Sequence, residues 1–373
     1  MVLKNDEYYM RLALIEALKG EGRTSPNPCV GAVIVKDGCI ISKGYHKEAG
    51  TPHAEVNAVA AASKSLAGAT MYVTLEPCNH TGKTPPCTKL IVEEGLSRVV
   101  VGAVDHNPFV DGGGIAFLRE NEIEVVSGVL RRECEEIIRP FVKRITHGVP
   151  WMIMKGGITL DGKINYTRGR SGWITGEQSM HEVHRIRDKV DAIIVGSGTV
   201  RIDNPSLTTR LQGCQGRDPL RAIIDTHLDL PLNSKLFHLE SDAETWVFCA
   251  AGAPEIKMAA LKECGVQVKI VASGKGGIDL AQAMAVLGKA DICTALVEGG
   301  AGLHGSFLKE KLFDSARLFF SPIFAGDGGL PLISGYSTKG RDSAPRLVDV
   351  SYKKLGDDMM ISGNFQYAGQ SAT

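Results

Sequence analysis

Strand-like and helix-like segments alternate along this chain, and the alternation stops once and then starts again. Short apolar runs bounded by turn residues are separated by amphipathic stretches of helical period. These runs lie at 30–36, 71–75, 98–104 and 123–126, and then at 151–155, 192–195, 220–224, 245–248, 266–271 and 295–298. Strands that alternate with helices favour a layered α/β architecture with a largely parallel sheet. The pattern therefore predicts two α/β domains, one after the other.

The break between the two runs lies at Gly148-Val149-Pro150. An amphipathic connector over residues 130–147 precedes it, and a new apolar run begins at Trp151. A chain of 373 residues is longer than a single hydrophobic core usually spans, so two domains are the expectation. We place the first domain at residues 1–147 and the second at residues 150–366.

Overall charge and cysteine usage bear on partners and compartment. Lysine plus arginine and aspartate plus glutamate number 42 each, so no net charge attracts a polyanion such as nucleic acid. The charged start lacks the apolar core of a signal peptide, and no stretch approaches the roughly 20 apolar residues needed to cross a bilayer. Nine scattered cysteines do not indicate a disulfide framework. We expect a cytoplasmic protein without a membrane or nucleic-acid partner.

Three candidate metal ligands and one acid follow each other in the first domain. His53-Ala54-Glu55 precedes Pro77-Cys78, and Cys87 comes after eight intervening residues. One imidazole and two thiolates suit a catalytic Zn²⁺, which keeps three protein ligands and one open position for water. Such an ion makes hydroxide available near neutral pH, and a nearby carboxylate can move the protons. This pattern is typical of nucleobase deaminases, so we predict zinc on His53, Cys78 and Cys87, with Glu55 catalytic.

The spacing of the two cysteines departs from the usual deaminase pattern, in which two residues separate them. Here the intervening residues end in Pro85-Pro86, which predicts that Cys87 begins a helix. A helix N-terminus favours a thiolate through the helix dipole. The alternative is a structural zinc site with four protein ligands, for which His80 is the nearby fourth candidate.

A glycine-rich turn follows the apolar run at 295–298 in the second domain, and a further strand is expected near 317–320. Gly300-x-Gly302-x-x-Gly305 opens a predicted helix, as in a dinucleotide-binding fingerprint. The motif lies late in the domain, and no acidic residue ends a strand about 20 positions further on, which disfavours a Rossmann fold. Backbone N–H groups at a helix N-terminus bind phosphate in other folds too. The glycines could equally serve close packing of the helix on the sheet.

Motifs in both halves resemble, in the same order, those of the bifunctional deaminase/reductase family of riboflavin biosynthesis. They are Asn27–Lys36, His53–Glu55, Thr74–Cys87 and Asp105–Pro108, and then Thr159–Lys163, Ser171–Thr175, Asp203–Pro205 and Val297–Gly300. The resemblance covers nearly the whole chain, and the long loop between the two cysteines is its most specific part.

The resemblance implies two activities. A cytidine-deaminase-like, three-layer α/β/α domain would deaminate 2,5-diamino-6-(5-phosphoribosylamino)pyrimidin-4(3H)-one with Zn²⁺. A dihydrofolate-reductase-like α/β domain would then reduce the ribosyl group of 5-amino-6-(5-phosphoribosylamino)uracil to ribityl with NADPH. Members of such a family generally form homo-oligomers, so a dimer or tetramer is expected.

The resemblance also implies which residues contact the ligands. The pyrimidine contacts in the first domain are Asn27, His46, Lys83 and Asn107. The substrate contacts in the second are Ser171, Arg187, Leu207, Arg210 and Glu298. The cofactor contacts are Gly157, Trp173, Thr199, Asp203, Gly300, Ala301, Gly302, Leu303, His304, Gly305 and Ser306. Arginine and lysine suit phosphate recognition, and opening of the ribose ring needs an acid, for which Lys155 and Asp203 are both candidates.

Two other functions are compatible with the residues. One is a nucleic-acid-editing zinc deaminase with an appended binding domain, which the balanced charge disfavours. The other is a zinc-stabilised scaffold with degenerate sites, which the intact set of three ligands and one acid disfavours.

Overall fold

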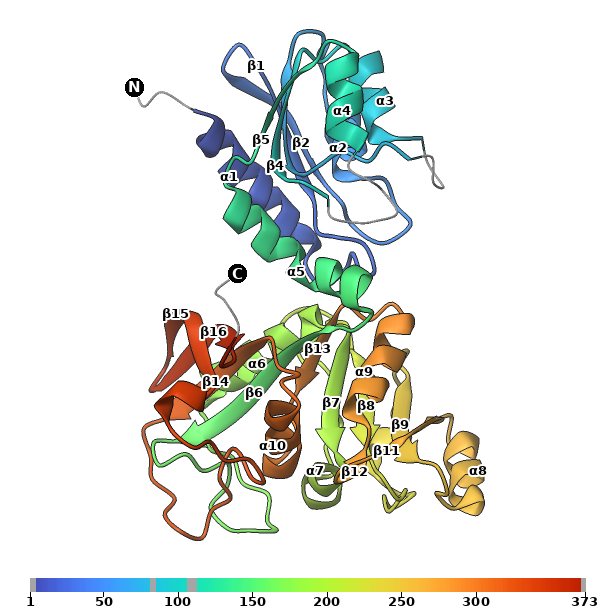
Figure 1. Ribbon diagram of the computed structural model, residues 1–373, viewed down its shortest axis with the longest axis vertical. Coiled ribbons are helices and arrows are strands. Elements are labelled where there is room, and N and C mark those ends of the chain that lie inside the picture. The colour runs from blue at the N-terminus through green and yellow to red at the C-terminus, as the bar shows by residue number, and fades with distance from the viewer. Residues whose placement is uncertain (1–4, 81–84, 106–112, 370–373) are drawn as a thin grey trace. The chain divides into compact units, whose positions relative to one another are not determined.

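The computed structural model describes residues 5–80, 85–105 and 113–369, and the chain forms two compact units, Met1–Gly148 and Val149–Thr373 (Figure 1). Within the described ranges, no helix has both the length and the apolar character needed to span a bilayer. All nine cysteines lie in these ranges, and none of them forms a disulfide.

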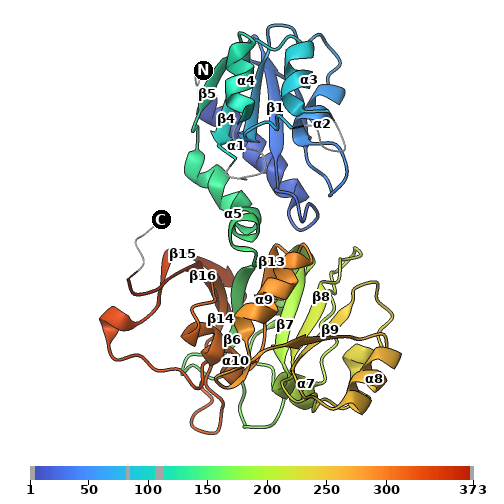
Figure 2. The same ribbon diagram turned by 45° about the vertical axis from the view of Figure 1, so that its right-hand side comes forward.

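The first unit is a five-stranded sheet covered by helices on both faces (Figures 1 and 2). Its strands are β1 (Gly31–Lys36), β2 (Cys39–Tyr45), β3 (Thr70–Leu75), β4 (Arg98–Ala103) and β5 (Glu124–Ser127). The helices α1 (Asp6–Ala17) and α5 (Arg131–His147) pack on one face, and α1 continues into the short 3-10 helix Leu18–Gly20. The helices α2 (Ala54–Ala60), α3 (Cys87–Glu93) and α4 (Gly113–Glu120) pack on the other. The predicted three-layer α/β/α architecture is confirmed.

The strands of this sheet lie in the order β2-β1-β3-β4-β5, and only two of the four neighbouring pairs are parallel. The expectation of a largely parallel sheet is therefore wrong for this unit. β1 runs antiparallel to both of its neighbours, while β3, β4 and β5 are parallel. The reason is the two-residue turn between β1 and β2, where Asp37 and Gly38 have φ values of 52° and 71°. Positive φ at both positions makes a tight hairpin, which reverses the chain within the sheet.

The second unit is built on a nine-stranded sheet in the order β10-β9-β8-β7-β13-β6-β14-β16-β15. The first seven of these are parallel: β6 (Trp151–Thr159), β7 (Ala192–Gly196), β8 (Leu220–Ile224), β9 (Thr245–Ala250), β10 (Gln267–Val271), β13 (Thr294–Val297) and β14 (Ser315–Ser321). One face carries α6 (Glu177–Lys189), α7 (Ser197–Asp203) and α8 (Glu255–Glu263). The other carries α9 (Leu280–Lys289) and α10 (Ala301–Lys309). A small hairpin, β11 (Ser273–Gly274) with β12 (Gly277–Ile278), and two 3-10 turns, Lys235–Phe237 and Arg341–Ser343, complete the unit.

The sheet ends in an antiparallel hairpin that the sequence pattern does not predict. β15 (Arg346–Leu355) and β16 (Asp358–Gln366) add to β14, with β15 at the edge. Most side chains of β15 are exposed, so this strand carries few of the buried apolar residues from which strands are recognised.

Candidate functional sites

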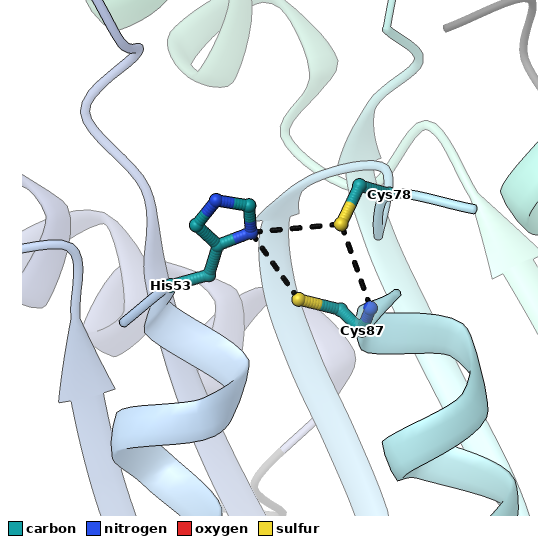
Figure 3. A group of neighbouring side chains, drawn as sticks. All are labelled: His53, Cys78 and Cys87. Carbon is teal, nitrogen blue, oxygen red and sulfur yellow. Dashed lines mark hydrogen bonds between the residues drawn. The ribbon is translucent and has the colours of Figure 1, made fainter. Parts of the chain in front are cut away.

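The three predicted metal ligands lie together in the first unit, on three different segments (Figure 3). His53 is the N-cap of α2, Cys78 follows β3, and Cys87 is the first residue of α3. The Nδ1 atom of His53 is 3.5 Å from Sγ of Cys78 and 3.3 Å from Sγ of Cys87. The Cys87 backbone N–H also donates to Sγ of Cys78 at 3.5 Å. The start of α3 at Cys87, after Pro86, agrees with the prediction from the two prolines.

The donor set fits a catalytic zinc ion. The three ligand atoms lie within 4.8 Å of one another, and the two N···S distances of 3.5 and 3.3 Å are close to the roughly 3.5 Å expected between donors of one tetrahedral zinc ion. Hydrogen bonds from Cys87 and His53 lower the pKa of Cys78, so a thiolate is available there. In the parts of the chain that the structure describes, this group holds only three residues, and His80 is exposed outside it. The geometry thus favours three ligands over a four-ligand structural site.

Glu55 lies in the first turn of α2, two residues after His53, with 3% of its surface exposed. Burial, with a smaller contribution from the neighbouring Cys78, raises the pKa of its carboxyl group to about 7. A carboxyl group that titrates near neutral pH both takes up and releases protons readily.

Asn27 and His46, both predicted pyrimidine contacts, lie side by side next to the metal ligands. The imidazole ring of His46 is 5.6 Å from that of His53, centroid to centroid. Its Nδ1 lies 3.2 Å from the carbonyl oxygen of Pro52, which can only accept, so Nδ1 carries the proton. The Nε2 atom therefore accepts from the Asn27 amide at 3.1 Å. This chain of hydrogen bonds fixes the orientation of both side chains.

Lys83 and Asn107, the other two predicted pyrimidine contacts, lie outside the described residues.

Sequence reasoning did not single out Glu76, which is buried directly after β3. Its carboxylate accepts the backbone N–H groups of Ile115 at 2.9 Å and Asp105 at 3.3 Å. Glu76 thus ties the start of α4 to the loop that carries Cys78. The sequence feature that could have pointed to Glu76 is its place directly before the Pro77-Cys78 pair.

The second unit has a cavity of about 1540 Å³ at the carboxyl ends of its central strands. This volume exceeds the roughly 300–1,000 Å³ of a site for one small ligand, so it has room for a dinucleotide beside a second molecule. Sixteen of the residues predicted for the reductase site line it: Lys155, Gly157, Ser171, Trp173, Arg187, Thr199, Asp203, Leu207, Arg210, Glu298, Gly300, Ala301, Gly302, Leu303, His304 and Ser306.

The glycines at the start of α10 have different roles. Gly300 is the N-cap of α10, and its N–H donates to Oγ1 of Thr199 at 3.0 Å. A Cβ at Gly302 would meet no atom within 4 Å, so this side of the helix N-terminus is open. Such a terminus, in a cavity of this size, fits a phosphate group of NADPH. A Cβ at Gly305 would lie 1.8 Å from the carbonyl oxygen of Ser334. Gly305 is therefore needed for close packing, which is one of the two roles left open for these glycines, and its contact with the cofactor stays a prediction.

A cluster of three charged side chains lines the cavity. The guanidinium of Arg187 donates to both carboxylate oxygens of Glu298, from Nε at 2.8 Å and from Nη2 at 2.7 Å. Nζ of Lys155 lies 4.0 Å from Oε2 of the same carboxylate. Burial opposes ionisation of Glu298, but the two cations hold its pKa at about 2. Burial lowers the pKa of Lys155, and Glu298 partly offsets this.

Arg187 is predicted to contact the substrate, but most of its N–H donors already bond to groups of the protein. Its Nη1 also donates to the carbonyl oxygen of Thr208 at 3.0 Å, so three of its five N–H donors are used inside the protein.

The two candidate proton donors of the reduction, Lys155 and Asp203, differ in their surroundings. Lys155 is partly buried beside Glu298, whereas Asp203 is exposed at the end of α7 and, among the described residues, makes no ion pair with Lys155.

We expect Glu298→Gln to destabilise the second unit by about 3–5 kcal/mol, because it leaves two partly buried cations without a counter-charge. Unfolding in urea at neutral pH measures this. Since the folded-state pKa of Glu298 lies below the ordinary 4.5, the pair stabilises the fold above that pH and loses this effect as the pH falls towards 2. The control is Lys353→Met, which breaks an exposed ion pair with Glu182 and should cost less than about 1 kcal/mol. Equal effects of the two substitutions would contradict the expectation.

The two units match different families of known proteins. Residues 3–103 match the zinc-binding region of cytidine and deoxycytidylate deaminases. Residues 150–361 match the RibD C-terminal domain.

The chain as a whole is similar to complete proteins of one kind. It is 40% identical to the riboflavin biosynthesis protein RibD of Bacillus amyloliquefaciens, over 96% of this chain and 95% of the relative. It is 40% identical to RibD of Aquifex aeolicus, over 97% and 99%. A solved structure from Thermotoga maritima, described as a diaminohydroxyphosphoribosylaminopyrimidine deaminase/5-amino-6-(5-phosphoribosylamino)uracil reductase, is 37% identical over 97% and 99%, with a TM-score of 0.84. That of Acinetobacter baumannii RibD is 33% identical over 98% and 99%, with a TM-score of 0.86. The chain belongs to the RibD family of riboflavin biosynthesis proteins.

Proposed function

We propose that this chain catalyses two consecutive steps of riboflavin biosynthesis. The first unit hydrolyses the ring amine of 2,5-diamino-6-(5-phosphoribosylamino)pyrimidin-4(3H)-one to a carbonyl. The second reduces the ribosyl group of the product, 5-amino-6-(5-phosphoribosylamino)uracil, to ribityl with NADPH. The observation that carries the proposal is the convergence of His53, Cys78 and Cys87 beside a buried acid, Glu55, in a chain of this family.

In the deamination, His53, Cys78 and Cys87 would hold a zinc ion, which when bound would supply the Lewis acidity that makes hydroxide available near neutral pH. Glu55 takes the proton that the attacking water loses and passes it to the departing amine, so that ammonia leaves. Its pKa of about 7 suits both transfers. Asn27 and His46, held in place by their mutual hydrogen bond, orient the pyrimidine ring.

In the reduction, the start of α10 at Gly300 and Gly302 would hold NADPH, which when bound would supply a hydride to the anomeric carbon of the ribosyl group. The bond between that carbon and the ring oxygen breaks, and the ring oxygen takes up a proton, so one NADPH and one proton are consumed. Lys155 is our candidate for the donor of this proton, because burial lowers the pKa of its ammonium group and makes it more acidic. Arg210, exposed at the cavity, is the candidate cation for the substrate phosphate.

We also propose that the chain works in the cytoplasm as a homo-oligomer. The lack of disulfides among its nine cysteines, all of them described, is in keeping with a reducing compartment. The edge strand β15 exposes Val350 and Tyr352, and an exposed edge strand is a common site of pairing between copies. Light scattering of the purified chain measures the assembly directly, and a monomer would contradict this part of the proposal.

The proposed function can be tested on one preparation of the purified chain by measuring both ammonia release and NADPH oxidation. The purified chain, given Zn²⁺, NADPH and the diaminopyrimidinone phosphate, should release ammonia and then oxidise NADPH. Removal of the metal with a chelator should abolish ammonia release and leave reduction of supplied 5-amino-6-(5-phosphoribosylamino)uracil unchanged, because the cavity of the second unit contains none of the three ligands. Added Zn²⁺ should restore the first activity. Ammonia release at full rate without metal would refute the proposal.

The rival function, an editing deaminase that acts on nucleic acid, has a separate test. It requires RNA or single-stranded DNA binding that weakens steeply with salt. The balance of 42 basic and 42 acidic residues leads us to expect no such binding at physiological salt.

A further inference from the structure

One face of α6 holds the loop that carries Arg210. His184 and Arg187 are three residues apart on this helix, so their side chains lie on the same face. The Nδ1 atom of His184 accepts the backbone N–H of Arg210 at 3.1 Å, and Arg187 donates to the carbonyl oxygen of Thr208 at 3.0 Å. The loop therefore runs along the helix, and two helix side chains hold its backbone one turn apart.

His184 is 4% exposed and also lines the cavity. Because the Arg210 N–H is the donor in this contact, Nδ1 carries no proton, and the neutral ring has its proton on Nε2. Burial and the nearby cations of Arg187 and Arg210 lower the pKa of His184 to about 4, against a smaller opposite effect of Glu298. His181, on the same helix, acts in the same direction as the two arginines. The ring therefore remains a hydrogen-bond acceptor at neutral pH.

The position of the Arg210 guanidinium depends on this backbone. Arg210 is exposed, and its side chain makes one short-range contact, from Nη1 to Oγ1 of Thr208 at 3.2 Å. The backbone around it is held more firmly, since Asp218 accepts the N–H of Thr209 at 2.7 Å. Among the described residues the bond to Thr208 is the one restraint on this long side chain, so the region that its charge can reach at the cavity depends on where the backbone places residue 210.

We infer that His184 is a positioning residue for the phosphate of the reductase substrate, acting through the backbone N–H of Arg210. The inference rests on the proposed function, in which Arg210 meets that phosphate. Without the acceptor, the Arg210 N–H would turn to water, the loop would shift, and the guanidinium would no longer be held where the phosphate binds.

The test uses substitutions at His184 in the full-length chain. His184→Leu keeps an apolar side chain of similar bulk but no acceptor, and should raise KM for 5-amino-6-(5-phosphoribosylamino)uracil about tenfold. We expect kcat and KM for NADPH to stay within about twofold of the wild type, since one interaction with the substrate is weakened. His184→Asn places an amide oxygen near the position of Nδ1, and should restore KM to within about threefold of the wild type. The matched control is His181→Leu, because His181 contacts Gln212 and neither residue lines the cavity.

A double-mutant cycle with Arg210→Ala separates positioning from a general loss of structure. If His184 acts through Arg210, His184→Leu should change KM by less than about twofold once the guanidinium is gone. An equal effect in both backgrounds, or a parallel loss of kcat and of affinity for NADPH, would overturn the inference. If His184→Leu does not fold, as judged by melting temperature, the same cycle is run with His184→Ala. Failure of the wild-type chain to oxidise NADPH would instead refute the proposed function.

Discussion

Glu55→Gln should abolish ammonia release while leaving zinc binding and reduction intact. Glutamine has the size and shape of glutamate but cannot take up and release a proton, and loss of proton transfer by a positioned group typically costs about 10²–10⁴-fold in rate. We expect a loss of about 10³-fold or more, because this one side chain serves both the water and the leaving amine. Ammonia release under saturating diaminopyrimidinone phosphate is the measurement.

Two controls show whether the loss of ammonia release comes from proton transfer alone. Metal analysis should find the same zinc content as in the wild type, since His53, Cys78 and Cys87 are unchanged and the substituted side chain is not among them. Reduction of supplied 5-amino-6-(5-phosphoribosylamino)uracil should proceed at the normal rate, because Glu55 belongs to the other unit. Ammonia release within tenfold of the wild-type rate would show that Glu55 does not carry the protons.

The second large effect is expected in the reduction. Lys155→Met retains an unbranched apolar chain, which suits a position where the amino group lies 5.9 Å from the ring of Phe319, but it cannot donate a proton. We expect kcat for NADPH oxidation to fall by about 10²-fold or more, as for loss of a general acid. The pair of Arg187 with Glu298 remains, so the fold should tolerate the change.

The pH dependence gives an independent check. A proton donor works only while it is protonated, so the wild-type rate should fall as the pH rises through the depressed pKa of Lys155. Asp203→Asn serves as the comparison, because Asp203 is exposed at the end of α7. If Asp203→Asn lost more activity than Lys155→Met, the proton would come from the carboxyl group and our assignment would be reversed.

The metal group was predictable because its chemistry demands particular residues in a particular order. An imidazole, a carboxylate two positions later and two well-separated thiols rarely occur together for another reason, and the structure brings the three ligands together. Two α/β units were predictable because strands buried on both faces leave apolar runs in the sequence. The edge strand β15 left no such trace, because most of its side chains are exposed.

The partners of single residues were the least predictable. Arg187 and Glu298 are 111 positions apart, and nothing in either local sequence indicates that they form an ion pair. Gly305 belongs to a motif for which the sequence left phosphate binding and close packing both open, and only the fold shows that a carbonyl oxygen from residue 334 occupies the space beside it. The acceptor role of His184 depends on the path of a loop. Each of these contacts is set by tertiary packing between segments distant in the chain, which spacing within one segment does not reveal.

The three predicted zinc ligands come from the start of α2, the loop after β3 and the start of α3, so a bound ion would add a cross-link between segments that are otherwise joined by packing and by hydrogen bonds such as that from the Cys87 N–H to Cys78. An ion that binds the folded chain more tightly than the unfolded one adds stability that grows with the logarithm of its free concentration. The free energy of unfolding of the first unit therefore depends on the supply of zinc. A chain deprived of the metal would lose part of its stability together with its proposed deaminase activity.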